Sequence, residues 1–130
     1  RRPLLQFQMH DIRNHLGVAK PLVEVLRRYG IQVCVANVTG SAADLDLLAD
    51  LPVALAKLSF ATLLNTDAAE LIQVVQQLRT YGASVIAAGI EDPATIARVW
   101  NCRPDYIQGN SVQMPSSDLS YDFQHSTDEL

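Results

Sequence analysis

Short apolar runs alternate along the chain with amphipathic segments. The apolar runs are near-continuous and rich in Val, Ile and Leu, which is typical of buried strands. Between them, apolar residues recur at helical spacing. The pattern predicts strands over 4–9, 31–36, 53–58, 84–88 and 106–108, and helices over 21–29, 42–50, 68–81 and 93–100.

Residues at the ends of these segments support the predicted helix boundaries. Pro21 suits a first helical turn, where its missing N–H has no partner to lose. Gly30 is typical of the left-handed residue that ends a helix. Ser41 can cap the next helix with Asp44 in its first turn, and Asp67 opens a capping-box pattern.

One unit of the pattern occurs twice. Residues 26–36 run from a helix end through Tyr29 and Gly30 into an apolar strand, and residues 78–88 repeat this through Tyr81 and Gly82. Such alternation predicts parallel strands covered by helices. Two α/β architectures fit, a doubly wound sheet or part of a βα barrel, and periodicity does not choose between them.

Composition limits the class of protein. The 130 residues suffice for one domain, and the net charge of −4 argues against general nucleic-acid binding. No apolar run reaches 18 residues and no leader peptide is evident, so we expect a cytoplasmic protein without membrane insertion. Cys34 and Cys102 match no metal spacing and are expected to be free thiols. We assign residues 1–123 to the domain and 124–130 to a flexible tail.

Specific segments resemble the EAL family. Residues 87–92 (AAGIED) and 105–109 (DYIQG) resemble its AEGVET and DY-x-QG segments, and residues 51–59 resemble LPVDxLKID. Residues 5–11 and 33–40 match its LxLEITE and DDFGTG segments by position. The resemblance implies an α/β fold, the C-terminal part of an EAL-type βα (TIM-like) barrel with about five parallel strands and intervening helices.

EAL domains hydrolyse cyclic-di-GMP with divalent metals, which carboxylates hold at the strand ends. At the matching positions this chain has mostly neutral side chains, namely Gln8, Ala36, Asn37, Ser59 and Ala88. Two divalent ions need several anionic oxygen ligands. We therefore expect a degenerate domain with no catalytic residue, no metal and no cofactor.

Residues that keep the family's types are expected to bind cyclic-di-GMP instead. Gln108 can bond a guanine edge or a phosphate, and Gly109 allows close backbone approach. Glu91 can accept from guanine or brace its loop, and Lys57 can neutralise a phosphate. Pro115 ends a polar loop expected to line the ligand mouth. For Lys57 and Glu91, a purely structural role is the alternative to ligand binding.

The segment 113–123 resembles the end of the EAL domain in FimX-type regulators of type IV pili. That resemblance implies a cyclic-di-GMP receptor without turnover, with a PilZ-type adaptor as a partner. Because a barrel needs about 250 residues, the N-terminal half of the same domain or a second copy is expected to complete it. The alternatives are an interaction scaffold without nucleotide binding, an active phosphodiesterase, or an unrelated receiver-like domain.

Overall fold

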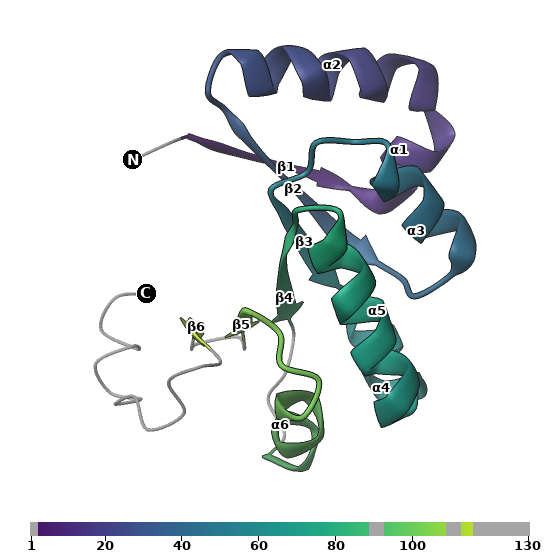
Figure 1. The fold of residues 1–130 in the computed structure, drawn as a ribbon, viewed down its shortest axis with the longest axis vertical. Coiled ribbons are helices and arrows are strands. Elements are labelled where there is room, and N and C mark those ends of the chain that lie inside the picture. Colours follow the sequence, from purple (N-terminus) through teal and green to yellow (C-terminus); the bar gives the residue numbers. More distant parts are fainter. Residues whose placement is uncertain (1–2, 89–92, 109–112, 116–130) are drawn as a thin grey trace.

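The computed structural model describes residues 3–88, 93–108 and 113–115. Five parallel strands form one sheet in sequence order, and a sixth strand pairs antiparallel with the fifth (Figure 1). The strands are β1 (Leu4–Gln8), β2 (Gln32–Val38), β3 (Leu55–Leu58), β4 (Ser84–Ala88), β5 (Tyr106–Gln108) and β6 (Gln113–Pro115).

The strand order decides between the two architectures that the sequence left open. A doubly wound sheet reverses its strand order at a switch point. Here β1 to β5 follow one another without reversal, and the helices gather on one side of the sheet (Figure 1). The chain therefore forms part of a βα barrel, as the family resemblance predicted.

Within the described residues, six helices lie between successive strands. They are α1 (Met9–Asn14), α2 (Leu16–Arg28), α3 (Ala42–Ala49), α4 (Phe60–Asn65), α5 (Ala68–Thr80) and α6 (Pro93–Trp100). The predicted caps are confirmed: the Ser41 and Asp67 side chains accept from the backbone N–H groups of Asp44 and Glu70. Gly30 and Gly82 have φ angles of +78° and +92°, as expected for left-handed stops.

The prediction for Pro21 was wrong. Helix α2 begins at Leu16, so Pro21 lies inside it and not in the first turn. Proline there removes the hydrogen bond to the carbonyl of Gly17. Pro21 and Gly17 are both exposed, so water can satisfy that carbonyl. The apolar face of the following residues outweighs the local cost, as the buried Val23 indicates.

Three further elements were not predicted. Helices α1 and α4 follow β1 and β3 and have only six residues each, too few to show a clear period. Strand β6 lies in the stretch expected to be a polar loop, and it pairs with β5 from Gln113 to Pro115. The proposed tail, 124–130, lies outside the described residues.

The hydrophobic core lies between the helices and the side of the sheet that faces them. Leu71, Val74, Val75 and Leu78 project from α5, and Val85 and Ala87 of β4 are fully buried. Cys34 and Cys102 are both buried and form no disulfide, as the sequence predicted. No helix in the described part of the chain is long and apolar enough to cross a membrane.

Candidate functional site

The face of the sheet turned away from the helices is the barrel interior, and much of it is polar. Partner residues in a parallel ladder share a face, so the registers define its layers. The first layer consists of paired residues from four strands, namely Gln6, Cys34, Leu55 and Ser84. In the next layer, Gln8 pairs with Ala36. Lys57 pairs with Ile86, which in turn pairs with Tyr106. At the carboxyl end of the sheet, the backbones of Ala88 and Gln108 are paired.

A cavity of about 470 Å³ opens on this interior face. Its lining includes Cys34, Lys57, Ser84 and Tyr106, which come from β2, β3, β4 and β5. Burial raises the pKa of the Cys34 thiol, and the positive charge of Lys57 lowers it in part. Lys57 is half-buried and forms no ion pair with any described residue, so its charge is available to the interior.

Gln8 and Asn37 meet where β1 and β2 reach the carboxyl edge of the sheet. The Asn37 Nδ2 donates to the Gln8 Oε1 at 2.5 Å. Asn37 has a φ of +59°, and the β2–β3 register shifts between Val35 and Val38. Asparagine tolerates this left-handed conformation, and a local bulge re-aims a side chain. The two residues thus form one amide pair, which we call the Gln8–Asn37 pair.

A buried carboxylate lies behind this pair. Asp44 of α3 is 1% exposed, and its Oδ1 accepts from the Arg13 Nε at 2.6 Å. Its Oδ2 accepts from the Arg13 Nη2 at 3.1 Å, the Thr39 backbone N at 3.0 Å and the Thr39 Oγ1 at 2.6 Å. The carboxylate therefore ties α1 to the loop that leaves β2. We call Arg13, Asp44 and Thr39 the Asp44 clamp.

The clamp shifts the pKa values of its members. Burial alone would raise the pKa of Asp44, but the hydrogen bonds from Arg13 and Thr39 and the Arg13 charge outweigh it. The pKa of Asp44 is therefore held below its usual value. The hydrogen bond to Asp44 raises the pKa of Arg13, against a smaller opposing effect of burial. Both groups are charged at neutral pH.

The predicted ligand residues are only partly placed. Lys57 lies on the interior face, and the Gln108 backbone ends β5 beside Ala88 at the carboxyl edge. Pro115 pairs with Tyr106, so Gln113, and not Pro115, lies level with Gln108. Glu91 and Gly109 are outside the described residues.

The predicted carboxylate replacements occupy strand ends, and some have local partners. Ser59 caps α4, where its Oγ accepts from the Thr62 N at 3.1 Å and donates to the Thr62 Oγ1 at 2.7 Å. Ala36 is buried beside Gln8. In the part of the chain that the structure describes, no three His, Cys, Asp or Glu side chains come close enough to hold a metal. The neutral donors at these strand ends do not fit the divalent ions of the family.

Sequence reasoning missed the clamp. It placed Asp44 in the first turn of a helix, which is correct, but gave Arg13 no role. The two residues are 31 positions apart, and no local motif links them. An aspartate in the first turn of a helix usually needs no partner other than the helix N-terminus.

Comparisons with known proteins agree with this geometry. A 76.5 kDa protein of Thiocystis violacea, encoded in the phbC 3′ region, is 54% identical over 123 residues, which cover 95% of this chain. The chain spans only 18% of that relative. The FimX EAL domain of Pseudomonas aeruginosa bound to cyclic-di-GMP superposes with a TM-score of 0.76 at 22% identity, covering 95% of this chain and 53% of that one.

A second solved structure has the same fold. The Bacillus subtilis YkuI protein, with an EAL domain in complex with its substrate cyclic-di-GMP and calcium, has a TM-score of 0.68 at 24% identity. The alignment covers 82% of this chain and 26% of that one. The family model described as the EAL domain matches residues 4–115, and the chain therefore belongs to the EAL domain family.

Proposed function

We propose that this chain is part of a cyclic-di-GMP receptor that binds the dinucleotide without hydrolysing it. The observation that carries the proposal is the Gln8–Asn37 pair. Its side chains stand at two strand ends where EAL enzymes hold metal ions with carboxylates, and they hydrogen-bond to each other at 2.5 Å. The donor and acceptor satisfy one another without a cation.

Electrostatics explains why this pair favours binding over catalysis. Two carboxylates at such a distance would repel and would need a metal ion between them. Two neutral amides attract through a hydrogen bond and give a divalent cation only weak ligands. Ala36, next to Gln8 in the register, adds no oxygen ligand. Metal-assisted attack of water on the phosphodiester is therefore not expected from these strand ends.

The polar interior supports recognition of a dinucleotide. Lys57 lines the interior cavity and forms no ion pair with a described residue, so its positive charge is available to a phosphate there. Gln108 stands at the end of β5 and can bond a guanine edge through its amide. We keep Glu91, Gly109 and Pro115 as proposed ligand contacts, on the basis of the family resemblance.

Binding at full affinity requires a complete barrel. Strand β1 is the edge of the described sheet, and its Leu4 and Leu5 are 49% and 45% exposed. Beside it, an apolar hollow of about 230 Å³ is lined in part by Phe7, Val18 and Leu22. An open strand edge next to an apolar hollow favours a further strand and helix. We propose that the first half of the same domain, or a second copy, completes the barrel here.

Calorimetric titration of the complete domain with cyclic-di-GMP tests the proposal. We expect saturable binding at micromolar or tighter affinity and no linear dinucleotide after incubation with Mg²⁺ or Mn²⁺. Turnover would overturn the claim of inactivity. An absence of binding would overturn the receptor claim and favour an interaction scaffold.

A paired variant tests the role of the amides. Gln8→Glu combined with Asn37→Asp places two carboxylates at the strand ends, and we expect it to gain a Mn²⁺ site by calorimetry. The control, Gln73→Glu combined with Gln76→Asp, adds the same charge to the exposed face of α5 and should gain none. Equal Mn²⁺ binding by both variants would refute the assignment of these positions.

The likeness to FimX EAL domains extends the proposal to type IV pilus regulation through a PilZ-type adaptor. The expected result is that a PilZ-type protein binds the complete domain more tightly when cyclic-di-GMP is present. Binding that does not respond to the dinucleotide would contradict this extension. The receptor claim itself would stand in that case.

A further inference from the structure

We propose that Arg13 and Asp44 are positioning residues for the ligand site. Their ion pair holds the exits of β1 and β2 together, so that the Gln8–Asn37 pair faces the barrel mouth in one fixed arrangement. The inference rests on the proposed function, because it assigns these amides to the wall of the cyclic-di-GMP site.

The connections between clamp and site are short. Helix α1 begins at Met9, directly after Gln8, and Arg13 lies on that helix. Thr39 follows Asn37 by two residues, and both its backbone N–H and its hydroxyl donate to Asp44. One carboxylate therefore contacts the segment after each amide. A shift of Asp44 would release both strand exits at once.

The clamp is well suited to rigid positioning. Two of the three Arg13 guanidinium nitrogens, Nε and Nη2, donate to the two Asp44 oxygens, which fixes orientation as well as distance. Asp44 is 1% exposed, so water competes little for its oxygens. By contrast, Asn37 is exposed and held in a left-handed conformation. This region is less favourable than the right-handed one for a residue with a side chain, so contacts with the surrounding structure help to hold it.

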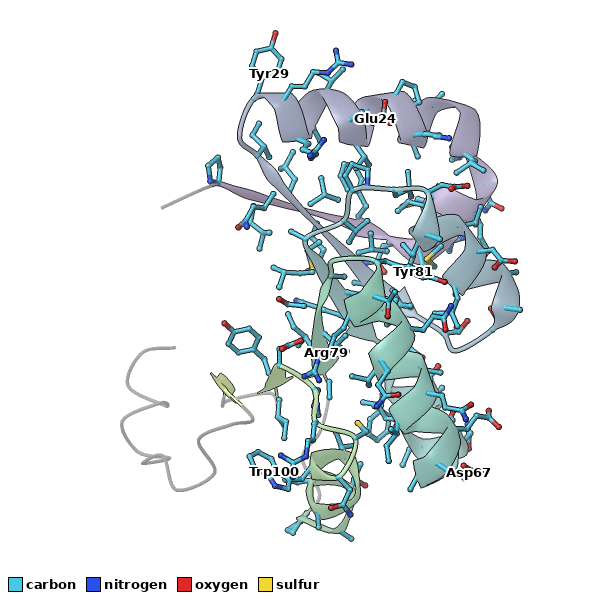
Figure 2. All side chains as sticks on the ribbon, viewed as in Figure 1. Glu24, Tyr29, Asp67, Arg79, Tyr81 and Trp100 are labelled. Atoms are coloured by element: carbon cyan, nitrogen blue, oxygen red, sulfur yellow. The ribbon has the colours of Figure 1, made fainter. Side chains whose placement is uncertain are left out.

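An Arg–Asp pair at the amino ends of the strands, opposite the carboxyl ends where the clamp lies, offers a matched control. Arg79, which is labelled in Figure 2, lies on α5. Its Nε and Nη2 donate to the Asp105 carboxylate at 3.5 Å and 3.3 Å. Asp105 also accepts from the Val85 backbone N at 2.6 Å, just inside the start of β4. This second Arg–Asp pair ties the amino ends of β4 and β5. It lies far from the carboxyl edge, where barrel enzymes place their sites.

The test compares Asp44→Asn with Asp105→Asn in the complete domain. Cyclic-di-GMP affinity is measured by calorimetry, and stability by urea unfolding, under conditions where each variant is folded. We expect Asp44→Asn to weaken binding by about tenfold, since two positioned hydrogen-bonding groups lose their alignment. Asp105→Asn should lose stability and keep the wild-type affinity. Equal affinities for the two variants would overturn the inference.

Two further measurements keep the test decisive. Arg13→Lys retains the positive charge but loses the two-nitrogen contact with Asp44, so it should weaken cyclic-di-GMP binding less than Asp44→Asn does. An affinity unchanged from the wild type would count against the clamp. The side-chain NH₂ signals of Gln8 and Asn37 in NMR spectra need no ligand. They should move toward free-amide positions in Asp44→Asn and stay in place in Asp105→Asn. Unmoved signals in Asp44→Asn would refute the positioning role of the clamp. A failure of the wild type to bind cyclic-di-GMP would instead refute the proposed receptor, and it would leave the NMR test of the clamp valid.

Discussion

Replacing Asn37 separately with alanine and with glycine tests the backbone conformation that aims its amide at Gln8. The Asn37 φ is +59°, in the left-handed region. Both variants lose the side-chain hydrogen bond to Gln8, so that contribution cancels when they are compared. The difference in the free energy of unfolding between the two variants therefore reports only the backbone preferences at position 37.

The magnitude follows from two opposing effects. An alanine forced into the left-handed region costs about 1–2 kcal/mol, whereas glycine adopts it freely. Glycine also gives the unfolded chain more freedom, which destabilises the folded state by about 0.4–1 kcal/mol. We therefore expect Asn37→Gly to be more stable than Asn37→Ala by about 1 kcal/mol.

Equilibrium urea unfolding followed by circular dichroism measures this difference. Asn101 provides the control, because it is exposed in a turn after α6 and lies outside the left-handed region. There the order should reverse, with alanine more stable than glycine by about 0.5 kcal/mol. If Asn37→Ala matched or exceeded Asn37→Gly in stability, the left-handed conformation and the aim of the amide would both be wrong.

Two other predictions concern the core and the clamp. Leu78→Ala removes a fully buried side chain between α5 and the sheet and should lower the free energy of unfolding by about 2–5 kcal/mol. The control, Gln76→Ala on the exposed face of α5, should change it by less than about 0.5 kcal/mol. Similar urea midpoints for the two variants would contradict the packing of Leu78. The lowered pKa of Asp44 contributes stability that is fully present above the unfolded value of about 3.9 and is lost as the pH falls through the folded value. Acid titration of stability should therefore be flatter in Asp44→Asn than in the wild type, and parallel profiles would refute the shift.

Local chemistry in the sequence predicted most of the scaffold. The capping side chains of Ser41 and Asp67 and the left-handed Gly30 and Gly82 act within four residues, so their roles are visible in the sequence. The five parallel strands were found for the same reason, since buried apolar runs are local. Pro21 shows the limit of this reasoning: its local cost was predicted, and the packing that outweighs it was not.

The candidate site divides in the same way. The sequence alone showed that neutral residues replace the family's carboxylates, because that statement needs only residue types at strand ends. It did not show that Gln8 and Asn37 bond each other across 29 positions, or that Asp44 joins Arg13 across 31. These contacts arise only when parallel strands bring their carboxyl ends to one edge. The amino-acid sequence determined which groups are available, and the tertiary structure decided which of them meet, because hydrogen bonds act over a few ångströms in space and not along the chain.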